Sequence, residues 1–446
     1  MSLIRSNFRE VLRNRNFFRL WWGQIISSIG DRFYQFAILY VLLRLTPEQG
    51  MWVGKESARV LFCGMLLTVV LAPWIGRVVD RWDRKWVMIG ADLSRVVLVL
   101  VMLGAWVAWK SPALMLVFVA LTGLMNGVFI PARQAAVPLL VESRQLVTAN
   151  ALITVVGVVA SLVGSGVGFV VAIFGEKSSF IITALGFLVS AILVGRIKGQ
   201  LKPTHSESRA VSWSEMGNTF LEVLRDKVVR QVFLVNGGIQ FVSGLFAVFI
   251  LEYVVQSLDM TDLRVVLDYF SKGVMALGFR EPVMEEHLVA VIFLLLSTGM
   301  GLVFGIGFSG RFVRLGHYEG LPMLMFGMLG LVFYGLSYAH SLEGVMGLCV
   351  LVGLASALLI VPMDARLQFH VPSGRHGEFF AVRSAWGCSC FLLALGLNLD
   401  GRLLAWRGAD QMIRDLSVFC VVLAGIMSLM DKNAFKRFWG ESLVEL

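Results

Sequence analysis

Residues 86–109 read WVMIGADLSRVVLVLVMLGAWVAW, and this stretch decides the fold class. It exceeds the roughly 20 apolar residues that an α-helix needs to cross a bilayer. Its two charges, Asp92 and Arg95, are three residues apart, so one helix turn brings them together as a self-neutralising pair. Similar windows recur along the chain, and they are continuously apolar, unlike the alternating strands of an outer-membrane barrel. The sequence therefore predicts an all-α polytopic membrane protein.

The composition agrees with this fold class. Of the 446 residues, 57% are hydrophobic and 15% are charged, whereas about 25% of a soluble domain is charged. These values exclude a disordered chain, a coiled coil and an ordinary soluble enzyme. At roughly 35–40 residues for each helix with its connection, the length allows about twelve crossings. The apolar windows fall near residues 17–44, 57–79, 86–109, 113–131, 147–174, 179–195, 231–256, 288–309, 320–339, 344–363, 379–399 and 412–430.

Two long polar segments interrupt these windows. One lies between the sixth and seventh windows, and the other follows the seventh. We therefore expect twelve transmembrane helices in two pseudo-symmetric six-helix bundles. The expected parts are an N-terminal bundle at 1–195 with a tail at 1–16, a linker at 196–230, a C-terminal bundle at 231–430 with an outer loop at 257–287, and a tail at 431–446.

The positive charge marks one side of the membrane. A net charge of +9 is also typical of nucleic-acid binding, but most Lys and Arg fall in the tails, the linker and every second loop. Since cytoplasmic loops carry an excess of these residues, both termini are expected in the cytoplasm. We expect the protein to lie in a bacterial inner membrane. Membrane lipid is an expected partner, and nucleic acid is not.

The outer loop 257–287 carries its own helical pattern. Its apolar residues recur at helical spacing, which is typical of a short amphipathic helix on the membrane surface. The loop is interpreted either as a surface insertion or as a lid over the outer mouth. The residues of the pattern are Leu263, Val266, Leu267, Phe270, Val274 and Leu277.

The two halves of the chain echo each other. The polar residues Gln24, Ser28 and Asp31 of the first window are spaced by four and three residues. The seventh window repeats that spacing with polar residues, and the ends of the fourth and tenth windows also match. A duplicated six-helix unit is typical of transporters, whose substrate sites lie near the bilayer midplane. The residues of the seventh window are Asn236, Gln240 and Ser243.

Asp31 is the leading candidate for function. A charge at the bilayer centre costs about 2.5–3.5 kcal/mol on insertion scales, so it needs a partner, a cavity or a function. Gln24, Ser28, Asp31 and Gln35 follow spacings of one helix turn and form one polar stripe. Two interpretations stay open for Asp31, which are a buried helix–helix hydrogen bond and a proton or substrate site lining a cavity.

Further polar residues fall inside the windows. Asn126 and Arg133 share a face of the fourth helix, and we expect Arg133 to snorkel at its cytoplasmic end. Arg383 in the eleventh helix has no obvious local partner, so we expect it to snorkel as well. The candidate polar contacts for a substrate are Gln24, Ser28, Asn126, Asn236, Gln240 and Ser243, and with Asp31 and Gln35 they make up the expected substrate and proton cavity.

The sequence lacks the motifs of an enzyme. HExxH, GxSxG, a Walker A loop and paired CxxC motifs are all absent. His370 and His376 share one loop without nearby thiols, and the five cysteines lie in apolar windows. We expect no enzyme activity, no metal and no cofactor. Since no nucleotide-binding loop is present, uphill transport needs an ion gradient or a partner.

The stretch from Gly76 to Lys85, GRVVDRWDRK, resembles the loop signature of the major facilitator superfamily, GxxxDRxxRR/K. Asp83 stands where that signature usually has glycine. The resemblance implies that this loop locks an inner gate in the outward-open state and does not bind substrate. The gate residues would be Gly76, Asp80, Arg81, Arg84 and Lys85.

Other stretches are similar to particular branches of that superfamily. Ser28–Asp31, Pro131–Gln134 and Ala149–Ala151 resemble the branch of macrolide and siderophore exporters, and also bacterial lysophospholipid transporters. The segment Val361–Gln368 is similar to the lysophospholipid-transporter motif V-P-L-N-A-L-L-Q, with Asp364 and Arg366 in place of Asn and Leu.

The resemblance implies a monomeric secondary transporter that works by alternating access, with helices 1, 4, 7 and 10 lining a central cavity. The expected function is proton-coupled efflux of a small amphipathic solute. The alternatives are transfer of a lipid-like lysophospholipid between leaflets, and a transport-dead sensor or scaffold with the same fold.

Overall fold

The computed structural model describes residues 8–45, 53–142, 145–202, 213–259, 261–276, 286–315, 320–371, 376–399 and 408–430. Within these ranges every named element is an α-helix, and an isolated bridge between Asp259 and Ser341 is the β-type pairing present. The chain forms two compact units. Unit 1 comprises residues 1–50, 59–212 and 272–284, and unit 2 comprises residues 51–58, 213–271 and 285–446. The prediction of an all-α fold is confirmed.

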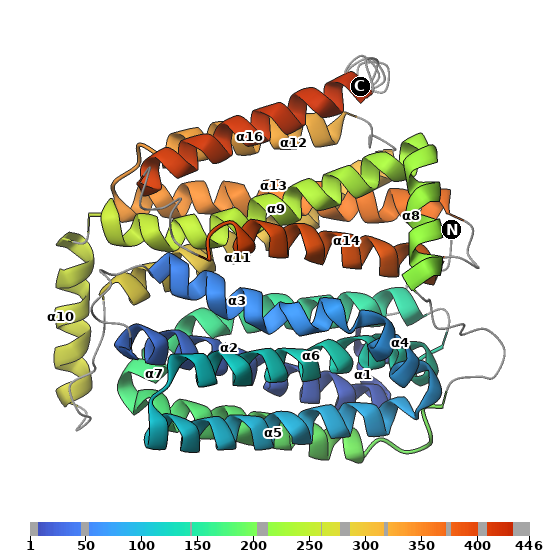
Figure 1. The fold of residues 1–446 in the computed structure, drawn as a ribbon, viewed down its shortest axis with the longest axis horizontal. Helices are drawn as coiled ribbons and strands as arrows, with labels where there is room; N and C mark the ends of the chain where they lie inside the picture. The colour runs from blue at the N-terminus through green and yellow to red at the C-terminus, as the bar shows by residue number, and fades with distance from the viewer. Residues whose placement is uncertain are drawn as a thin grey trace. The chain divides into compact units, whose positions relative to one another are not determined.

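Unit 1 is a bundle of long helices (Figure 1). α2 packs along α7, and α5 packs against both α6 and α7. The first turns of α3 are grouped with unit 2. The helices are α1 (Phe8–Arg13), α2 (Arg15–Leu45), α3 (Val53–Val70), α4 (Ala72–Arg81), α5 (Arg84–Trp109), α6 (Pro112–Leu140) and α7 (Leu146–Gly195).

Unit 2 is a second bundle, in which α9 packs against α13, α14 and α16. Figure 1 shows α8 and α10 set across the run of α9 at its two ends. The helices are α8 (Trp213–Arg225), α9 (Lys227–Gln256), α10 (Thr261–Ala276), α11 (Glu286–Leu315), α12 (Leu321–Leu336), α13 (Leu342–His370), α14 (His376–Gly396) and α16 (Ala409–Met430).

Local sequence explains where the helices break. The second window is divided into α3 and α4 because Pro73 can start a helix but cannot continue one. α7 contains the fifth and sixth windows as two arms, and the chain turns between them at Gly175, where φ is 77°. Glycine adopts this backbone conformation without steric cost. With α3 and α4 taken together and the arms of α7 separately, unit 1 has six long helical segments within the described residues, and unit 2 has six helices there besides α8 and α10.

Two polar segments of the sequence contain helices. The expected linker 196–230 holds α8, which the polar composition did not indicate. The outer loop 257–287 holds α10, as its apolar spacing predicts. On α10, Leu263 and Leu267 are buried and Tyr269 is exposed, so the helix is amphipathic.

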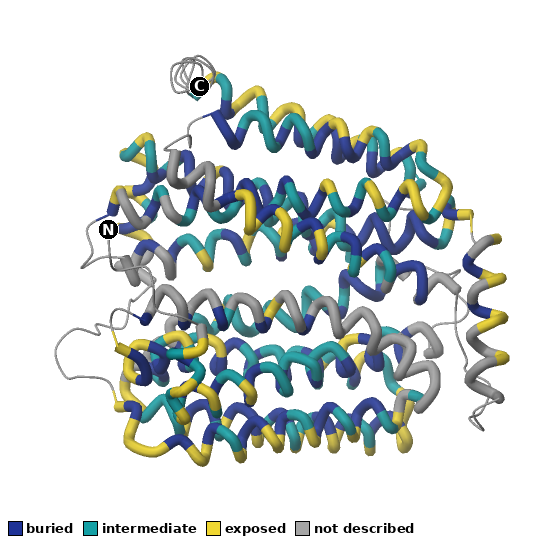
Figure 2. The backbone as a smooth tube through the Cα atoms, turned by 180° about the vertical axis from the view of Figure 1, so that it is seen from behind, coloured by how far each residue is buried: buried dark blue, intermediate teal, exposed yellow. Residues whose placement is uncertain are grey.

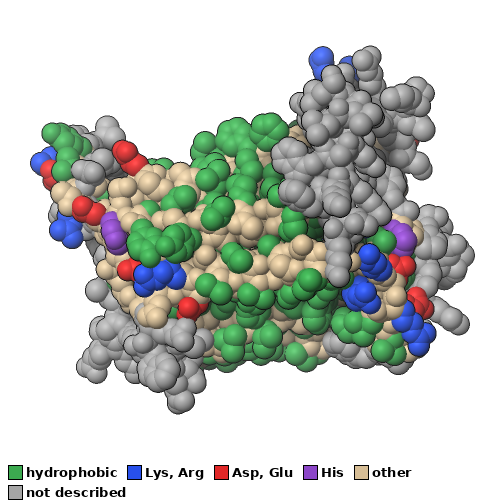
Figure 3. All heavy atoms as spheres, turned by 90° about the horizontal axis from the view of Figure 1, so that it is seen from above, with side chains coloured by type: hydrophobic (Ala, Val, Ile, Leu, Met, Phe, Trp, Pro, Cys, Tyr) green, Lys and Arg blue, Asp and Glu red, His purple; other side chains and the backbone are tan. Residues whose placement is uncertain are grey.

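The surfaces of the helices suit a membrane. Seven described helices are long and apolar enough to cross a bilayer. On the face of unit 2 that Figure 3 shows, hydrophobic side chains gather over the middle and charged side chains gather at the two ends. α5 has exposed Trp86 and Trp109 near its ends, about 35 Å apart along the axis. Tryptophan is enriched at both membrane–water interfaces, so these rings bracket the part of α5 in the hydrocarbon core.

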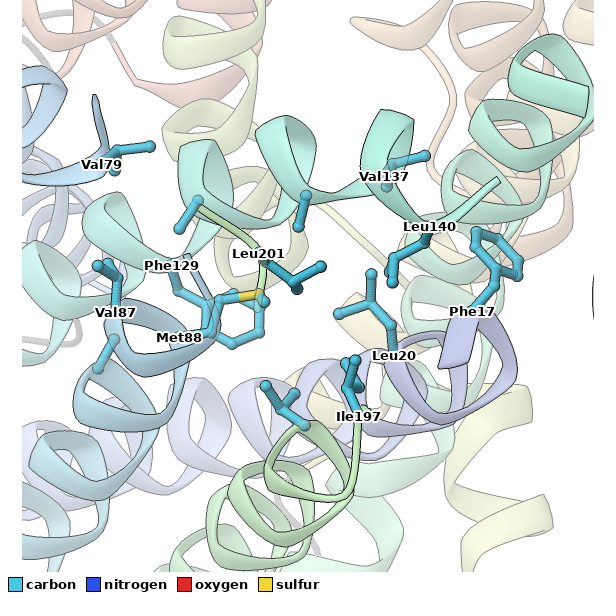
Figure 4. Packing of buried hydrophobic residues seen from close by; sticks show 14 of the residues in the cluster. Phe17, Leu20, Val79, Val87, Met88, Phe129, Val137, Leu140, Ile197 and Leu201 are labelled. Atoms are coloured by element: carbon cyan, nitrogen blue, oxygen red, sulfur yellow. The ribbon is translucent and has the colours of Figure 1, made fainter. Parts of the chain in front are cut away.

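The core of each helix bundle lies on the inward sides of its helices (Figure 2). In unit 1 one cluster joins Phe17 of α2, Met88 of α5 and Phe129 of α6, among others (Figure 4). α2 and α7 meet at small residues, since a Cβ on Gly186 would lie 3.3 Å from the carbonyl oxygen of Ile26. Small residues let helix backbones approach closely in membranes. This packing fixes the position of α2 next to the polar residues of α5.

Candidate functional site

A buried ion network lies in unit 1. The Arg95 side chain of α5 is fully buried and forms a salt bridge with Asp92, one turn earlier on the same helix. Arg95 Nη1 also lies 3.5 Å from Oδ1 of Asp31 on α2. Ser27 of α2 lies at the same guanidinium, with its Oγ 3.4 Å from Nη2. One arginine therefore joins two carboxylates from two helices.

Two aromatic rings complete the surroundings of Arg95. The guanidinium carbon lies 4.2 Å from the ring centroid of Phe187 on α7 and 4.9 Å from that of Phe129 on α6. Cation–π attraction of this kind strengthens when water is excluded. Four helices of unit 1 thus contribute to the position of one charge.

The network lies deep in the membrane-spanning part of α5. Arg95 follows Trp86 by nine residues and precedes Trp109 by fourteen, which places it about 13 Å and about 21 Å from them along the axis. Ionisable groups at such a depth are expensive and mark candidate functional sites. A stabilising role alone is a weak explanation, because a buried ion pair seldom outperforms apolar packing.

The three charged side chains differ in access to solvent. Asp92 and Arg95 have no exposed side-chain surface, whereas 26% of the Asp31 side chain is exposed. When all three are ionised, their charges sum to −1. Within the described residues, Asp92 Oδ2, Arg95 Nε and Arg95 Nη1 have no hydrogen-bond partner, so the contact between Arg95 and Asp31 is an ion pair without a hydrogen bond. Asp31 is therefore the member that a proton or a cationic ligand can reach.

The polar stripe predicted on α2 divides into separate contacts. Gln24 is buried and donates from Nε2 to Ser28 Oγ at 2.8 Å, two turns before Asp31. Gln35 is exposed and accepts a hydrogen bond from Arg32 Nη1 at 2.9 Å, which directs it toward Arg32. Gln24 and Ser28 therefore contact each other before Asp31 on α2, and Gln35 contacts Arg32 after it.

The fourth-helix candidates lie on α6. Asn126 is half-buried one turn before Phe129, whose ring covers Arg95. Arg133 is half-buried, and its Nε is buried without a hydrogen-bond partner in the described part of the chain. The roles of both residues stay predictions.

Part of the network could not be predicted from the sequence. Helical spacing pairs Asp92 with Arg95, as the structure confirms, but it does not join Arg95 to Asp31 or include Ser27, Phe129 and Phe187. The sequence offered one signal for the contact between Arg95 and Asp31, namely two opposite charges at similar depths in two apolar windows. The aromatic residues gave no signal, since phenylalanine is common in every window.

The seventh-helix candidates lie on α9. Asn236 is buried, and its Oδ1 has no hydrogen-bond partner among the described residues. It lies against Gly387 of α14, where an added Cβ would be 2.6 Å from that oxygen and 3.2 Å from Gln240 Cγ. Asn236 and Gln240 therefore share the side of α9 that packs on α14. Ser243 is half-buried one turn after Gln240 on the same helix.

The expectation for Arg383 is wrong. Its guanidinium does not snorkel alone, because it forms a salt bridge with Asp364 of α13. A neighbouring contact joins Arg366 Nη1 of α13 to Gln231 Oε1 of α9 at 2.6 Å. Partners that lie 19 and 135 residues away in sequence cannot be found from local spacing. Unit 2 therefore holds a second polar cluster.

The signature loop is fixed at the start of α5. Asp83 is the N-cap of α5, and its Oδ1 accepts hydrogen bonds from the backbone N–H groups of Lys85 at 3.0 Å and Leu201 at 3.2 Å. Lys85 Nζ donates to the Ile197 carbonyl oxygen at 2.7 Å. Asp83 thus has a structural role that the usual glycine could not fill. Arg81 is exposed and Arg84 is half-buried, while the surroundings of Gly76 and of the Asp80 side chain lie outside what the structure describes.

Metal and thiol chemistry find no support in the described residues. No group of three His, Cys, Asp or Glu side chains there could hold a metal ion. His370 Nε2 instead contacts Asp226 Oδ2 at 2.9 Å. The five cysteines are free.

Comparisons with known proteins agree with a transporter fold. A family profile described as the Major Facilitator Superfamily matches residues 20–395. Macrolide efflux protein A of Streptococcus pyogenes is 35% identical over 131 residues, which are 29% of this chain and 31% of the relative. The chain thus matches under a third of that relative's length. A lysophospholipid transporter of Photorhabdus laumondii is 24% identical over 452 residues, with 97% of this chain and 99% of the relative covered.

Solved structures share the fold. The nucleoside transporter NupG aligns over 95% of this chain and 100% of its own, with a TM-score of 0.63 and 16% identity. A POT family transporter in complex with 5-aminolevulinic acid aligns over 94% of this chain and 97% of its own, with a TM-score of 0.67 and 12% identity. At these identities the likeness concerns the fold alone.

Proposed function

The chain belongs to the Major Facilitator Superfamily, and from that premise we propose that it exports small amphipathic solutes in exchange for protons, with Asp31 as the proton carrier. The observation that carries the proposal is the contact between Asp31, which is partly exposed, and Arg95, which is fully buried. Transport then proceeds by alternating access between two six-helix repeats.

The charge of the network gives the coupling. With Asp31 ionised, the three side chains carry −1, and with Asp31 protonated they carry zero. Burying the ionised Asp31 carboxylate costs more than the attraction of Arg95 and of the neighbouring Arg32 returns, so the protonated network is the form that tolerates occlusion. A cationic amphipathic solute bound beside Asp31 would neutralise the network as a proton does. Proton and solute thereby compete for one carboxylate, which is the requirement for exchange.

Arg95 and Asp92 have a different task in this mechanism. Asp92 holds the guanidinium from its own helix, and the rings of Phe129 and Phe187 confine it. A fixed positive charge opposite Asp31 offsets part of the cost of ionising that carboxylate inside the membrane, so the carboxylate can both release and accept a proton. The arginine is thus a positioning residue, while Asp31 changes its charge.

Gradient-driven transport in proteoliposomes tests the proposal. Wild-type protein should move a fluorescent cationic amphipath against its gradient when a pH gradient is imposed, and Asp31→Asn should not. Gln35→Asn is a matched control, since it changes a polar residue one turn away that contacts Arg32. Equal gradient-driven transport by Asp31→Asn and wild type would refute the assignment of the proton carrier.

A second candidate function has separate support. The match to the lysophospholipid transporter of Photorhabdus laumondii extends over nearly the whole length of both chains. We therefore also propose lysophospholipid transfer between leaflets as the alternative to solute export. Transfer of a fluorescent lysophospholipid without a pH gradient would favour it. A protein that moves neither probe and is stabilised by neither would be a sensor or scaffold.

The membrane placement follows the same reasoning. We propose an inner-membrane monomer with both termini in the cytoplasm, because the Lys and Arg residues concentrate in the segments on that side. Reporter fusions to each terminus test the orientation. A periplasmic reporter signal at either end would contradict it.

A further inference from the structure

The helix α8 is held by one face against unit 2, where it packs on α9 and α14. Thr219 and Val223, one helix turn apart on α8, are each 1% exposed. The ring of Phe220 lies against Trp386 of α14, with 5.4 Å between the ring centroids. Trp386 in turn donates from Nε1 to the Phe233 carbonyl oxygen of α9 at 3.0 Å. The orientation of α8 about its own axis is therefore fixed.

The turn between α8 and α9 is short and capped on both sides. Asp226 is the single residue between the two helices and is the N-cap of α9. Its Oδ1 accepts hydrogen bonds from the backbone N–H groups of Val228 at 2.8 Å and Val229 at 3.0 Å. Arg230 Nη1 donates to the Leu224 carbonyl oxygen near the end of α8 at 2.9 Å. These contacts hold α8 across the start of α9, as Figure 1 shows.

The exposed side of α8 divides into an apolar flank and a polar flank. Leu221 and Leu224 are 55% and 48% exposed, and at about 100° per residue they point within about 60° of each other. Asn218 and Arg225 are also exposed and point within about 20° of each other. The centres of the apolar flank (Leu221, Leu224) and the polar flank (Asn218, Arg225) are about 80° apart around the axis. Neither flank coincides with the buried face.

This division is typical of a helix at a membrane surface. Such a helix lies in the plane of the interface, with its apolar side in the boundary of the acyl chains and its polar side in water. A helix surrounded by water would gain nothing from two exposed leucines set apart from its polar residues. The apolar flank of α8 therefore calls for an apolar partner.

The helix α10 shows the same division at the other end of α9. Its Leu263 and Leu267 are buried, while Val265 and Tyr269 are exposed one turn apart. Arg264 is exposed about 100° away from Val265, so the exposed side again has an apolar and a polar flank. Unit 2 thus has two crosswise amphipathic helices, one at each end of the same spanning helix.

The length of α9 identifies the partner. α9 has 30 residues, which correspond to about 45 Å along its axis, and it is apolar enough to cross a membrane. A bilayer with its head-group regions is about 40–45 Å thick. The two amphipathic helices are therefore separated by the distance between the two surfaces of a bilayer. A protein partner on α8 would place no such requirement on the length of α9.

The charges beside the apolar flank suit a phospholipid surface. Arg225 on the polar flank and Lys227 at the start of α9 are exposed. Long basic side chains at such a level lay their stems on apolar surface and place their charges among head-group phosphates. Glu222 is exposed on the same side of α8 as Arg225, so the surface carries both signs of charge. This pattern fits phospholipids in general and does not select an anionic lipid.

We propose that α8 binds the surface of the lipid leaflet at the start of α9. Leu221 and Leu224 lie in the boundary of the acyl chains, and Asn218 and Arg225 face water. The bound leaflet sets the depth of the first turn of α9, because the capped turn joins the two helices with one intervening residue. The surface belongs to unit 2 and involves neither Asp31 nor Arg95.

The reactivity of single added cysteines tests this surface. Leu221→Cys, Leu224→Cys, Asn218→Cys and Arg225→Cys are placed singly in phosphatidylcholine nanodiscs that hold one protein each. The rate of reaction with a charged, water-soluble maleimide is then measured. Wild type gives the background from the five free cysteines of the chain. Because the thiolate is the nucleophile and apolar surroundings suppress it, the two leucine positions should react about tenfold or more slowly than Asn218→Cys and Arg225→Cys.

Two controls separate burial in lipid from other causes. Equal melting temperatures show that the variants fold alike, and unfolding in denaturant should make the four rates equal. A fluorophore on Leu224→Cys, attached in detergent before reconstitution, should be quenched by phosphatidylcholine with brominated acyl chains. The same fluorophore on Asn218→Cys should be quenched by iodide in the water instead.

Three results would overturn the proposal. One is labelling of both leucine positions in nanodiscs as fast as that of Asn218→Cys. Another is protection of the leucine positions in native membranes that is lost in nanodiscs, which would assign the apolar flank to a protein partner. The third is a slowly labelled Leu224→Cys whose fluorophore brominated acyl chains do not quench, which would mean that another part of the protein covers the flank.

Discussion

Replacing Arg95 by glutamine should be among the most damaging single substitutions in unit 1. The change leaves the Asp92 carboxylate fully buried without its cation and places it near a second carboxylate, Asp31. Removing one partner of a buried pair typically costs about 3–5 kcal/mol, because the remaining charge is uncompensated. We expect Arg95→Gln to lower the free energy of unfolding by about that amount.

The contact with Asp31 has its own magnitude. Two unit charges 3.5 Å apart attract by about 5 kcal/mol at an effective dielectric constant near 20. A quarter of the Asp31 side chain is exposed, so solvent screening reduces the net coupling to about 1–3 kcal/mol. A double-mutant cycle of Asp31→Asn and Arg95→Gln isolates this value.

Denaturant unfolding in detergent micelles is the assay. The protein's free energy of unfolding is measured for wild type, both single variants and the double variant, with ligand absent. Addition of Asp92→Asn to Arg95→Gln should restore much of the loss, since it removes the stranded charge. Effects of Asp31→Asn and Arg95→Gln that add within about 0.5 kcal/mol would refute a direct interaction between them.

The remaining predictions concern packing and helix caps. Gly353→Ala should destabilise the protein by at least about 1–3 kcal/mol, because the new Cβ would overlap the backbone carbonyl oxygen of Thr298 and lie 2.8 Å from the backbone nitrogen of Leu302. Gly347→Ala on the same helix meets nothing within 4 Å and should be neutral. Asp83→Ala should cost about 1 kcal/mol through loss of an N-cap, with the melting temperature as the measurement and Asp83→Asn as the tolerated control. Burial acts to raise the pKa of Asp226, but hydrogen bonds from two backbone N–H groups and its histidine contact hold the pKa below the usual 3.8. A lowered folded-state pKa means that the ionised form stabilises the protein above pH 3.8 and that this contribution is lost as the pH falls through the folded value. The stability difference between wild type and Asp226→Asn should therefore shrink as the pH is lowered below 4; a difference that grows as the pH falls below 4 would contradict the sign.

The fold could be predicted from the sequence because a bilayer restricts the choices. Long apolar windows must form helices, since every backbone polar group in hydrocarbon needs an internal partner. The window at residues 86–109 and helix α5 agree within a few residues. The break at Gly175 could be predicted, because it falls between two apolar windows. The helix α8 in the linker could not, because its polar composition forms no apolar window.

The candidate site was predictable only where the contacts are local. Spacing alone paired Asp92 with Arg95 on one helix turn. It could not join Arg95 to Asp31 or Arg383 to Asp364, because those contacts depend on how neighbouring helices rotate and pack. Local spacing gave no partner for Arg383 because that partner, Asp364, lies on another helix. In the lysophospholipid-transporter motif this position is a neutral asparagine.

The central claim is that protonation of Asp31 couples the proton gradient to transport. Solute counterflow and pH-driven uptake, measured side by side in proteoliposomes, test it most directly. Asparagine imitates the protonated carboxyl and cannot pair with a cationic solute, so the account predicts that Asp31→Asn loses all response to the pH gradient and shows weakened exchange of solute for solute. Uptake by Asp31→Asn that still follows the pH gradient as wild type does would contradict the account.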